Sequence, residues 1–576
     1  MKRWMKYVKP YLPYFLLGPI CMIVEVIGEI LMPKFLGNII NSAATSSPWF
    51  SVGTAGLMIL TALLMMAGGV GGAYFGAKAS VNFAADLRKD IYSHVQAFSF
   101  ANVDKFSSGS LITRLTNDVT QLQNFVNMLL RMFLRSPGML IGALIMAISL
   151  NPKLSLVLCV TIPLLLFSVL SVISIGFKRF GKMQKNIDRL NSTVQENITN
   201  IRVVKSFVRE DFEKEKFARA SGDLKDATMS ALRVMIFISP VMTFFMNVTT
   251  IAVLWFGGRM VAVEGMPIGD LSAFITYVTQ ILSSLMMVTM MLMNSSRAMA
   301  SAKRITEVLD EKLDIAEDQA DPQHTVKEGK IEFRNVSFRY YKNSEEMVLS
   351  NINLTIQPGQ TVGIIGSTGC GKTTLVSMIL RLYDVDEGQV LVDDVDVREY
   401  LLHNLREGVG MVLQKNILFS GTIEDNLRWG NEDATDEELI KFATYAQADK
   451  FISSFPEGYQ TELEQGGVNV SGGQKQRLCI ARALLKKPKI LILDDSTSAV
   501  DTATEKMILE AFESELKGST KIIIAQRISS VMGADRIVVM NEGEIAAVGT
   551  HEELLSCSED YREIYEIQTQ SSRKEG

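Results

Sequence analysis

The sequence predicts a multi-domain protein: an all-α amino-terminal part with six membrane-spanning helices, and an α/β carboxy-terminal part. Three observations lead to this prediction. Six apolar runs of about membrane-spanning length occupy the first half of the chain. In the second half, one apolar run leads into a glycine-rich loop and another ends in two aspartates. The chain has 576 residues, which is too long for one compact core.

The composition agrees with a membrane protein. Hydrophobic residues make up 47% of the chain, and 30 of its residues are methionine. The 58 Lys and Arg residues are balanced by 63 Asp and Glu residues without a basic tail or stripe, so nucleic acid is not expected as a partner. The cysteines lie far apart and form no C-x-x-C pair, which favours reduced thiols over disulfides or a metal site.

Each apolar run suits a helix that crosses the hydrocarbon core, which takes about 20 residues. Only Asn151 and Pro152 separate the third run from the fourth, which predicts a tight turn between antiparallel helices. The first run contains Glu25 and Glu29 and lacks a small-residue cleavage site, so we expect a retained helix and not a signal peptide. The runs lie at about 13–33, 54–77, 130–150, 153–177, 234–257 and 269–293.

Positive charge is distributed unevenly over the connections between these runs. The first and fifth connections, near 41–52 and 258–267, are short and hold only Arg259 as a cation. The second and fourth are long, have a helical pattern and hold many Lys and Arg residues. Because such residues stay on the cytoplasmic side, we expect a multi-pass protein of the cytoplasmic membrane with its N-terminus, both long connections and the α/β domain in the cytoplasm.

The glycine-rich loop has the spacing of a P-loop, with a strand expected before it and a helix after it. Its glycines let backbone N–H groups face phosphates, Lys372 reaches the β and γ phosphates, and Thr373 offers its hydroxyl to Mg2+. A chance glycine-rich turn is the alternative, and the flanking strand and helix argue against it. The predicted nucleotide-binding residues are Gly366, Ser367, Thr368, Gly369, Cys370, Gly371, Lys372, Thr373 and Thr374.

A second apolar segment of the carboxy-terminal half, 489–493, ends in Asp494 and Asp495. This is the Walker B pattern, in which the first acid holds the metal, usually through water. The pattern is weak by itself because many buried strands end in aspartate. Together with the P-loop it predicts a site for ATP and Mg2+, with Thr373 and Asp494 at the metal.

An acidic stretch with Pro322 separates the two parts, so we expect a transmembrane domain over 1–315, a linker over 316–330 and a nucleotide-binding domain over 331–576.

A third motif points to a family. The segment 471–477, Ser-Gly-Gly-Gln-Lys-Gln-Arg, resembles the signature motif of ATP-binding cassette (ABC) transporters, and it precedes the Walker B strand by one short helix. The resemblance covers nearly the whole chain, and the long connections around 114–118 and 195–207 resemble the intracellular loops of type IV exporters. The resemblance implies that Tyr340 stacks on adenine and that Gln414 is a metal ligand that senses the coupling helices. It also adds Asp501, in the D-loop motif 498–501, and the signature residues Ser471, Gly472, Gly473 and Gln474.

The resemblance also implies an assembly. In that family two nucleotide-binding domains stack head to tail, and each ATP lies between the P-loop of one domain and the signature serine of the other. The signature opens a helix, whose amino-terminal end attracts the γ-phosphate. Segments near 98–103 and 202–207 are expected to end in short helices that dock on the nucleotide-binding domains, the second one on the partner's. Closure of the domains would then switch access from inward to outward.

Two positions depart from the family pattern. Asp495 stands where the family has a glutamate as general base, and Gln526 stands where it has a switch histidine. Each change alone is compatible with tolerated drift in an active enzyme. Together they predict a site that binds ATP and hydrolyses it slowly, as in the degenerate half of a heterodimeric exporter, although a homodimer is also possible. The predicted catalytic residues are therefore Asp495, Gln526 and Gln414.

Two features of the membrane part bear on the substrate. Methionines 286, 287, 290, 291 and 293 in the sixth run are suited either to varied apolar ligands or to helix packing. Glu25 and Glu29 stand four residues apart on one helix face, where they could attract cationic lipophiles, pair with other groups or snorkel. We expect a hydrophobic or amphiphilic substrate, with drug, lipid and peptide all open, and contact with membrane lipid.

Three other classes of protein fit the sequence less well. An ATP-gated regulator or channel on the same fold would also tolerate weak hydrolysis. The six runs exclude a soluble cassette ATPase of DNA repair or translation. An importer is disfavoured because importers usually carry membrane and ATPase domains on separate chains.

Overall fold

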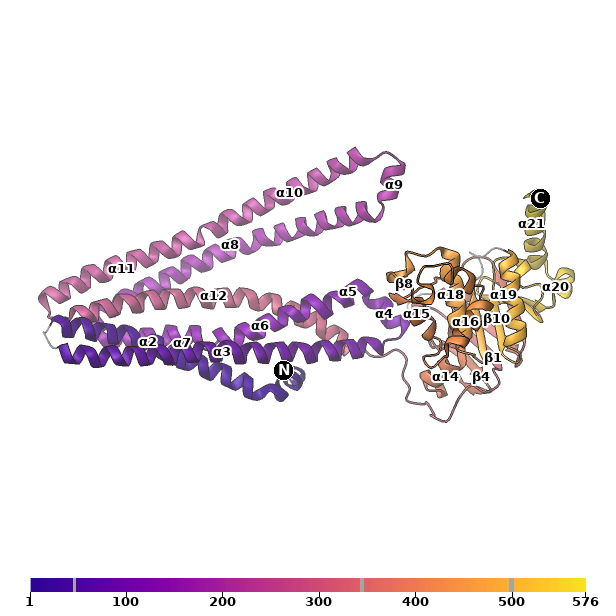
Figure 1. Cartoon of the computed structure of the whole chain (residues 1–576). Helices are drawn as coiled ribbons and strands as arrows, with labels where there is room; N and C mark the ends of the chain where they lie inside the picture. Colours follow the sequence, from indigo (N-terminus) through magenta and orange to yellow (C-terminus); the bar gives the residue numbers. More distant parts are fainter. Residues whose placement is uncertain (1, 45–47, 342–345, 497–501, 576) are drawn as a thin grey trace. The chain divides into compact units, whose positions relative to one another are not determined.

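The structure, a computed structural model, describes residues 2–44, 48–341, 346–496 and 502–575. Its chain forms two compact units, seen in Figure 1. Unit 1 comprises Met1–His94 and Gly109–Asp310, and unit 2 comprises Val95–Ser108 and Glu311–Gly576.

Unit 1 is helical. Within the described chain, six helical stretches are long and apolar enough to cross a membrane, and each predicted apolar run overlaps one of them. The predicted all-α part is therefore confirmed. Its elements are α1 (Lys2–Val8), η1 (Lys9–Tyr11), α2 (Leu12–Ala44), α3 (Pro48–Gln96), α5 (Ser108–Thr113), a π-helical turn η2 (Arg114–Asp118), α6 (Val119–Met132), α7 (Arg135–Leu150), α8 (Pro152–Thr199), α9 (Ile201–Ser206), α10 (Glu210–Ile236), α11 (Ile238–Val263) and α12 (Ile268–Asp310).

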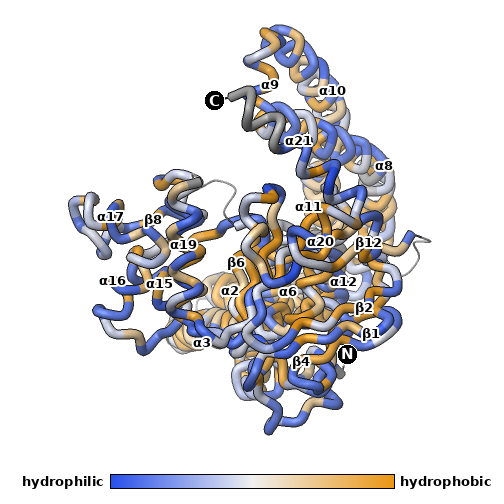
Figure 2. Tube along the Cα trace, turned by 90° about the vertical axis from the view of Figure 1, so that its right-hand side faces the viewer, coloured by the Kyte–Doolittle hydropathy of each residue, from blue (hydrophilic) through white to orange (hydrophobic). Residues whose placement is uncertain are grey.

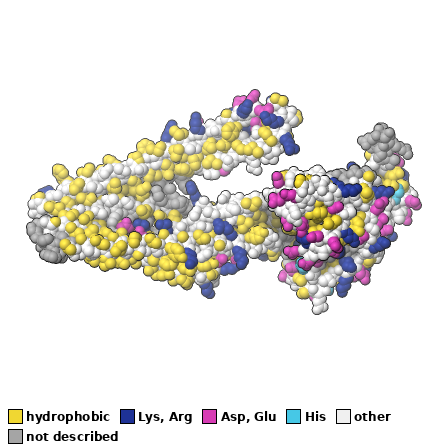
Figure 3. Space-filling model, in the orientation of Figure 1, with side chains coloured by type: hydrophobic (Ala, Val, Ile, Leu, Met, Phe, Trp, Pro, Cys, Tyr) yellow, Lys and Arg dark blue, Asp and Glu magenta, His cyan; other side chains and the backbone are white. Residues whose placement is uncertain are grey.

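Several helices are much longer than a membrane is thick. Helix α3 has 49 residues and α8 has 48, whereas about 20 cross the hydrocarbon core. In Figure 1, α8 and α10 run side by side as an arm that turns at α9. Figure 3 shows hydrophobic side chains over much of unit 1, with Lys, Arg, Asp and Glu gathered at the end of this arm. The extensions therefore have the polarity expected of segments outside the lipid.

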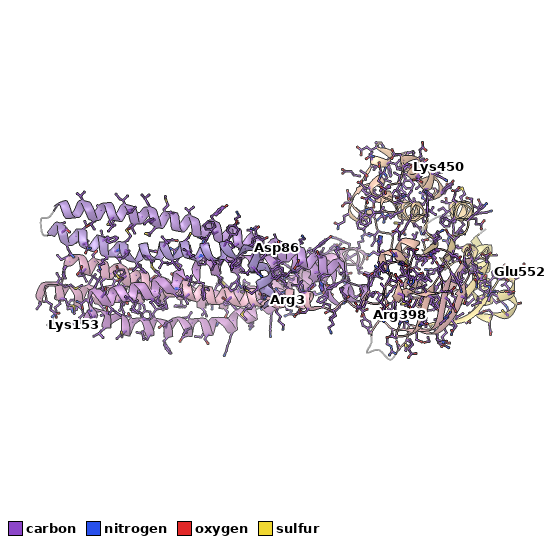
Figure 4. All side chains as sticks on the ribbon, turned by 90° about the horizontal axis from the view of Figure 1, so that it is seen from below. Arg3, Asp86, Lys153, Arg398, Lys450 and Glu552 are labelled. Atoms are coloured by element: carbon purple, nitrogen blue, oxygen red, sulfur yellow. The ribbon has the colours of Figure 1, made fainter. Side chains whose placement is uncertain are left out.

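The turn between α7 and α8 forms as the sequence predicts. Asn151 is the N-cap of α8, and its side-chain oxygen accepts a 3.0 Å hydrogen bond from the backbone N–H of Leu154. Pro152 occupies the first helical position, where its missing N–H has no intrahelical partner to lose. In Figure 4 Lys153, next to this turn, lies at one end of unit 1, and Arg3 and Asp86 lie toward the other end.

Helices α2 and α12 approach each other closely. A Cβ on Gly269 would lie 2.0 Å from the carbonyl oxygen of Gly37, so the backbones meet only because both positions lack side chains. The hydroxyl of Tyr277 on α12 donates a 2.7 Å hydrogen bond to the backbone oxygen of Ile30 on α2. Helix α7 also packs on α2, since a Cβ on Gly142 would lie 2.2 Å from Cδ1 of Ile30. These contacts hold α2, α7 and α12 together.

Unit 2 is an α/β domain, which confirms the second half of the predicted fold class. Its main sheet has the strand order β12-β11-β3-β10-β9-β6, in which only β12 pairs antiparallel, and its second sheet has the order β2-β1-β4-β5. The strands are β1 (Ile331–Phe338), β2 (Leu349–Ile356), β3 (Thr361–Gly366), β4 (Glu387–Val392), β5 (Val395–Asp396), β6 (Val409–Val412), β7 (Gly421–Thr422), β8 (Glu462–Leu463), β9 (Ile490–Asp494), β10 (Thr520–Ile524), β11 (Arg536–Asn541) and β12 (Glu544–Gly549).

The central strands bury both of their faces. Along β9, Leu491 and Leu493 enter one hydrophobic core and Ile490 and Ile492 enter another. This explains why such strands appear in the sequence as continuous apolar runs. In Figure 2, β6 is largely hydrophobic, whereas the chain around α16 and α17 is largely hydrophilic. The helices of unit 2 are α4 (Phe100–Phe106), α13 (Lys372–Ile379), η3 (Val397–Glu399), α14 (Leu402–Gly408), α15 (Ile423–Arg428), α16 (Asp436–Tyr445), α17 (Asp449–Ile452), η4 (Gly458–Gln460), η5 (Gln465–Gly467), α18 (Gly472–Leu485), α19 (Thr502–Glu515), η6 (Ile528–Ser530), α20 (His551–Cys557) and α21 (Glu559–Glu575).

The segment expected to be a linker lies against unit 2. Val326 is buried in one of its hydrophobic cores, and the backbone N–H groups of residues 327–330 all donate to the carboxylate of Asp393. The backbone N–H of Leu402 donates a 2.6 Å hydrogen bond to Glu317. These contacts order the residues that lead into β1.

Candidate nucleotide site

The strand order of the main sheet brings the nucleotide motifs together. Strands β3, β10 and β9 run parallel and adjacent, and Ile524 lies opposite both Ile364 and Asp494. Because parallel strands end at the same edge of a sheet, the segments that follow them lie side by side. These segments are the P-loop after β3, residues 525–528 after β10 (the switch loop) and Asp495 after β9.

The P-loop lies between β3 and α13. Ser367, Thr368 and Gly369 are exposed, whereas the side chain of Cys370 is buried in a hydrophobic core. Gly371 has a φ of 95° and a Cβ there would lie 2.9 Å from the carbonyl oxygen of Val348, so this position requires glycine. The loop therefore presents its backbone to solvent at the start of a helix, as phosphate binding requires.

Two side chains at the start of α13 face the groups that would bind phosphate and metal. The Lys372 ammonium donates to the backbone oxygens of Gly366 at 2.9 Å and Ser367 at 2.7 Å, so it lies over the loop. The Thr373 hydroxyl donates a 3.0 Å hydrogen bond to Oδ1 of Asp494. The threonine and the Walker B aspartate, 121 positions apart in the chain, are thus in direct contact.

The surroundings of Asp494 fit a cation. Its side chain is 2% exposed, and Oδ2 is buried with no hydrogen-bond partner. Burial raises the pKa of this carboxyl above its usual value, and the neighbouring Asp495 adds to the rise, against the hydrogen bond from Thr373. An unpartnered buried carboxylate oxygen beside a threonine hydroxyl is an oxygen-rich environment of the kind that Mg2+ prefers.

Asp495 is held by the two glutamines that the sequence singled out. Its backbone adopts the left-handed conformation, with a φ of 47°. Oδ2 of Asp495 accepts a 2.8 Å hydrogen bond from Nε2 of Gln526 and a longer one, 3.4 Å, from Nε2 of Gln414. The three predicted catalytic residues therefore meet at one carboxylate oxygen.

The switch loop is held by a residue that the sequence analysis missed. Gln568, on α21, accepts a 2.9 Å hydrogen bond from the backbone N–H of Ile528 and donates a 2.8 Å bond to the backbone oxygen of Gln526. One side-chain amide thus bonds to both ends of the turn that carries Gln526. No sequence signal could have identified it, because a glutamine on a polar helix 42 positions away is indistinguishable from a solvated one.

Tyr340 follows β1 and lies next to the P-loop helix. Its hydroxyl is 2.8 Å from the hydroxyl of Thr374, and its ring lies edge-on to Phe338 and Tyr383, with centroids 5.1 and 5.2 Å away. Its side chain remains partly exposed. The structure therefore places this partly exposed aromatic ring beside the helix that follows the P-loop.

The signature motif stands apart from these residues. Ser471 is the N-cap of α18: its hydroxyl accepts from the backbone N–H of Gln474 at 3.3 Å, and its own backbone N–H donates to Oε1 of Gln474 at 2.9 Å. Within the described chain, the side-chain hydrogen bonds of both residues stay inside the motif, and Ser471 and Gly472 are exposed. Asp501 and the motif 498–501 lie outside the described residues.

A short helix of the first long connection belongs to unit 2. Helix α4 begins at a capping box of Ser99 and Asn102, and the Asn102 amide donates a 3.0 Å hydrogen bond to the backbone oxygen of Lys312. The Phe100 ring lies 6.1 Å from that of Tyr383. The same tyrosine touches Tyr340, so one ring connects α4 with the aromatic residue beside the P-loop.

Comparison with known proteins identifies the family of the chain. Residues 15–285 match the model of the ABC transporter transmembrane region, and residues 349–498 match the model of the ABC transporter family. The chain belongs to the ABC transporter family: it is an ATPase coupled to transport, a multi-pass membrane protein with an exporter fold, and a half-transporter that dimerises with a second subunit.

Individual relatives span the whole chain. It is 39% identical to the uncharacterized ABC transporter ATP-binding protein YfiB of Bacillus subtilis, over 99% of this chain and 98% of that protein. It is 32% identical to the ATP-dependent lipid A-core flippase of Syntrophus aciditrophicus, over 98% of this chain and 94% of that protein. A bacterial Atm1-family ABC exporter with ATP bound has the same fold, with a TM-score of 0.78, 23% identity and 98% coverage of both chains.

Proposed function

We propose that this chain is one half of an exporter that moves a hydrophobic or amphiphilic substrate across the cytoplasmic membrane by alternating access. The observation that carries the proposal is the contact of Thr373 with Asp494 beside Lys372, in a chain that also has six membrane-spanning stretches. The same chain thus combines a site suited to ATP with helices long and apolar enough to cross a membrane. The proposed domains are 1–315, the linker 316–330 and 331–576.

The proposed orientation places the N-terminus and the nucleotide-binding domain in the cytoplasm. The Lys and Arg residues of the second and fourth connections support this orientation, since positive residues remain on that side. The charged end of the α8–α10 arm in Figure 3 agrees with it.

Each site residue then has a role. Backbone N–H groups of 366–371 and the Lys372 ammonium bind the phosphates, Thr374 supports the loop, and Tyr340 stacks on adenine. Thr373, Asp494 and Gln414 would hold Mg2+, which would neutralise charge on the β and γ phosphates. The signature residues and Asp501 would act in the second nucleotide site of the dimer, across the interface.

Hydrolysis at this chain's own P-loop is proposed to be slow. Aspartate is shorter than glutamate by one methylene, about 1.5 Å of bond length, and a displacement of about 1 Å in a catalytic group can cost about a hundredfold in rate. Gln526 cannot carry the positive charge of a protonated histidine. In addition, Oδ2 of Asp495 already accepts hydrogen bonds from Gln526 and Gln414, so a water molecule that bonds to this oxygen must compete with both amides. These features support a heterodimer in which the partner supplies the faster site.

The end of the α8–α10 arm supports the need for a second subunit. Phe207 is 73% exposed and Val208 is 81% exposed, next to α9. Large apolar side chains this exposed, outside the membrane, are suited to burial against another protein surface. By family resemblance, that surface is the partner's nucleotide-binding domain.

The heterodimer is tested by measuring ATP turnover of the purified chain alone and together with its partner subunit. We expect little turnover alone and restored turnover in the complex, with two different subunits in native mass spectra. Brisk hydrolysis by a complex of identical subunits, stimulated by lipophilic compounds, would contradict the proposal.

A second candidate is a homodimeric lipid exporter. It is favoured by the similarity to proteins named as lipid A-core flippases, one of them 35% identical over 84% of this chain. ATP-dependent movement of lipid between leaflets by the chain alone would support this candidate over the heterodimer.

A further inference from the structure

A small cavity lies inside unit 1, at the place where α2, α7 and α12 pack together. It has a volume of about 150 Å³. Because one water molecule occupies about 30 Å³ of liquid, the cavity suits a small headgroup and not a whole lipid. Most of its lining residues are polar, among them Glu29, Arg135, Ser136, Thr279 and Gln280, although it lies in helices that cross the membrane. Apolar atoms, such as those of Met287, nevertheless make up most of the lining surface.

Among the residues that the structure describes, the ion-paired charges beside this cavity do not balance. Arg135 lies 3.2 Å from Oε1 of Glu25 through Nη1 and 3.3 Å from Oε2 of Glu29 through Nη2. Two carboxylates against one guanidinium leave a formal charge of −1. An uncompensated charge is costly at membrane depth, so a cation that enters the cavity is favoured by the relief of that cost.

Two buried acceptor oxygens at or near the cavity have no hydrogen-bond partner. Gln280 donates from Nε2 to the backbone oxygen of Glu29 at 3.0 Å, and its Oε1 is buried without a partner. The Thr279 hydroxyl donates to the backbone oxygen of Ile275, which leaves only its lone pairs for the cavity. Oε2 of Glu25, on the far side of Arg135, is also buried and unpartnered.

Ser136 gives an independent indication of a ligand. It lines the cavity, it is 1% exposed, and its hydroxyl oxygen has no hydrogen-bond partner. Buried polar groups almost always have a partner, and an exception calls for an explanation. A donor placed in the cavity would satisfy Ser136 and Gln280 together.

We propose that this cavity is a subsite for the headgroup of an amphiphile that carries a protonated primary or secondary amine. The N–H groups of such a headgroup supply the donors that Ser136 and Gln280 lack, and its positive charge offsets the surplus carboxylate. Met287 lines the cavity and is 39% exposed, so an alkyl tail can leave along it. Met286 and Met291 lie on the same helix, and the side chains of Met290 and Met293 lie outside the described residues.

This inference rests on the proposed export function and refines the two sequence hypotheses on the substrate. Glu25 and Glu29 are paired through Arg135, so neither is an isolated attractant for cations. What remains for a ligand is one net negative charge together with the unpartnered acceptors. The site therefore selects for hydrogen-bond donors as well as for charge.

The test compares three probes with the same alkyl chain: dodecylamine, its trimethylammonium analogue and dodecanol. Binding to the full-length transporter complex in lipid nanodiscs is measured, and binding to empty nanodiscs is subtracted. We expect dodecylamine to bind at least about tenfold more tightly than either analogue, because hydrogen bonds to charged groups are worth about that factor or more. Equal affinities for the three probes would overturn the proposal.

Variants locate the binding. Ser136→Ala and Gln280→Leu should each weaken dodecylamine binding about three- to tenfold, and Glu29→Gln about tenfold or more. Ser149→Ala is the matched control: Ser149 lies on α7 as well, but it is exposed and its hydroxyl donates to the backbone oxygen of Met146. If Glu29→Gln fails to fold, the two neutral variants still decide the matter. Unchanged affinity in both of them would refute the assignment.

Transport in inverted vesicles separates this inference from the export function. Suppose that the complex binds the three probes equally and that its vesicles still move dodecanol when ATP is added. This result would refute the subsite and leave the export function standing. Vesicles in which ATP moves none of the probes and none of a panel of lipids would refute export. Faster ATP-driven movement of dodecylamine, lost in Ser136→Ala, would support both.

Discussion

The double substitution Asp495→Glu with Gln526→His tests whether this chain's own nucleotide site is slow for the reasons proposed. In the structure, Oδ2 of Asp495 lies 2.8 Å from Nε2 of Gln526 and 3.4 Å from Nε2 of Gln414. The extra methylene of glutamate extends the carboxylate by about 1.5 Å. The carboxylate would then meet the Gln526 amide, and for that reason the second substitution accompanies the first.

The expected gain follows from this displacement. If an error of about 1 Å costs about a hundredfold, its repair should speed hydrolysis at this site by about a hundredfold. That factor corresponds to about 2.7 kcal/mol of activation free energy. The single substitution Asp495→Glu should give less, because Gln526 still bonds to the carboxylate and supplies no positive charge.

The assay is single-turnover cleavage of labelled ATP by the transporter complex in nanodiscs, with nucleotide crosslinked to each subunit to separate the two sites. Asp433→Glu makes the same chemical change at an exposed position of unit 2 and serves as the control. Equal rates in the double variant and the parent protein would refute the reasoning. So would rapid cleavage at this P-loop in the parent protein.

The other predictions concern unit 2 and the end of the arm. Gln568→Ala removes two hydrogen bonds from the switch loop, at about 1 kcal/mol each. It should therefore slow ATP turnover several-fold without lowering the unfolding temperature by more than a few degrees. Unchanged turnover would show that the loop keeps its conformation without Gln568. Burial raises the pKa of the Cys479 thiol, so its thiolate is scarcer at pH 8 than that of an ordinary cysteine. Mass spectrometry should therefore find exposed Cys557 alkylated long before Cys479. Equal labelling of the two cysteines would contradict the burial of Cys479. Phe207→Asp and Val208→Asp should abolish substrate-stimulated ATP turnover yet leave the fold intact, since both side chains are exposed within the chain; full stimulation would argue against docking by the arm.

Much of the fold could be predicted because its signals are local. The six apolar runs are a direct consequence of the membrane as solvent, and the Asn151–Pro152 turn was visible because both residues have strong positional preferences. The P-loop and the Walker B strand were identified for the same reason. Each is a short stretch in which the chemistry limits the residue type position by position.

The pairing of distant residues could not be predicted in this way. Nothing in the local sequence shows that Gln568 bonds to the switch loop or that Arg135 pairs with both Glu25 and Glu29, because such contacts depend on how helices pack. The sequence left Glu25 and Glu29 open among attraction of cations, pairing and snorkelling. The packing of α2 against α7 places both carboxylates against Arg135.

The sequence alone predicted which residues bind phosphate and metal and that two catalytic positions depart from the family pattern, and it located the six stretches apolar enough to cross a membrane. These properties reside in single side chains and their neighbours along the chain. Only the tertiary structure placed Gln526 and Gln414 on one oxygen of Asp495 and left the acceptors of Ser136 and Gln280 without a donor. A hydrogen bond depends on distances of a few tenths of an ångström between segments far apart in the chain, and those distances are set by the packing of the whole fold.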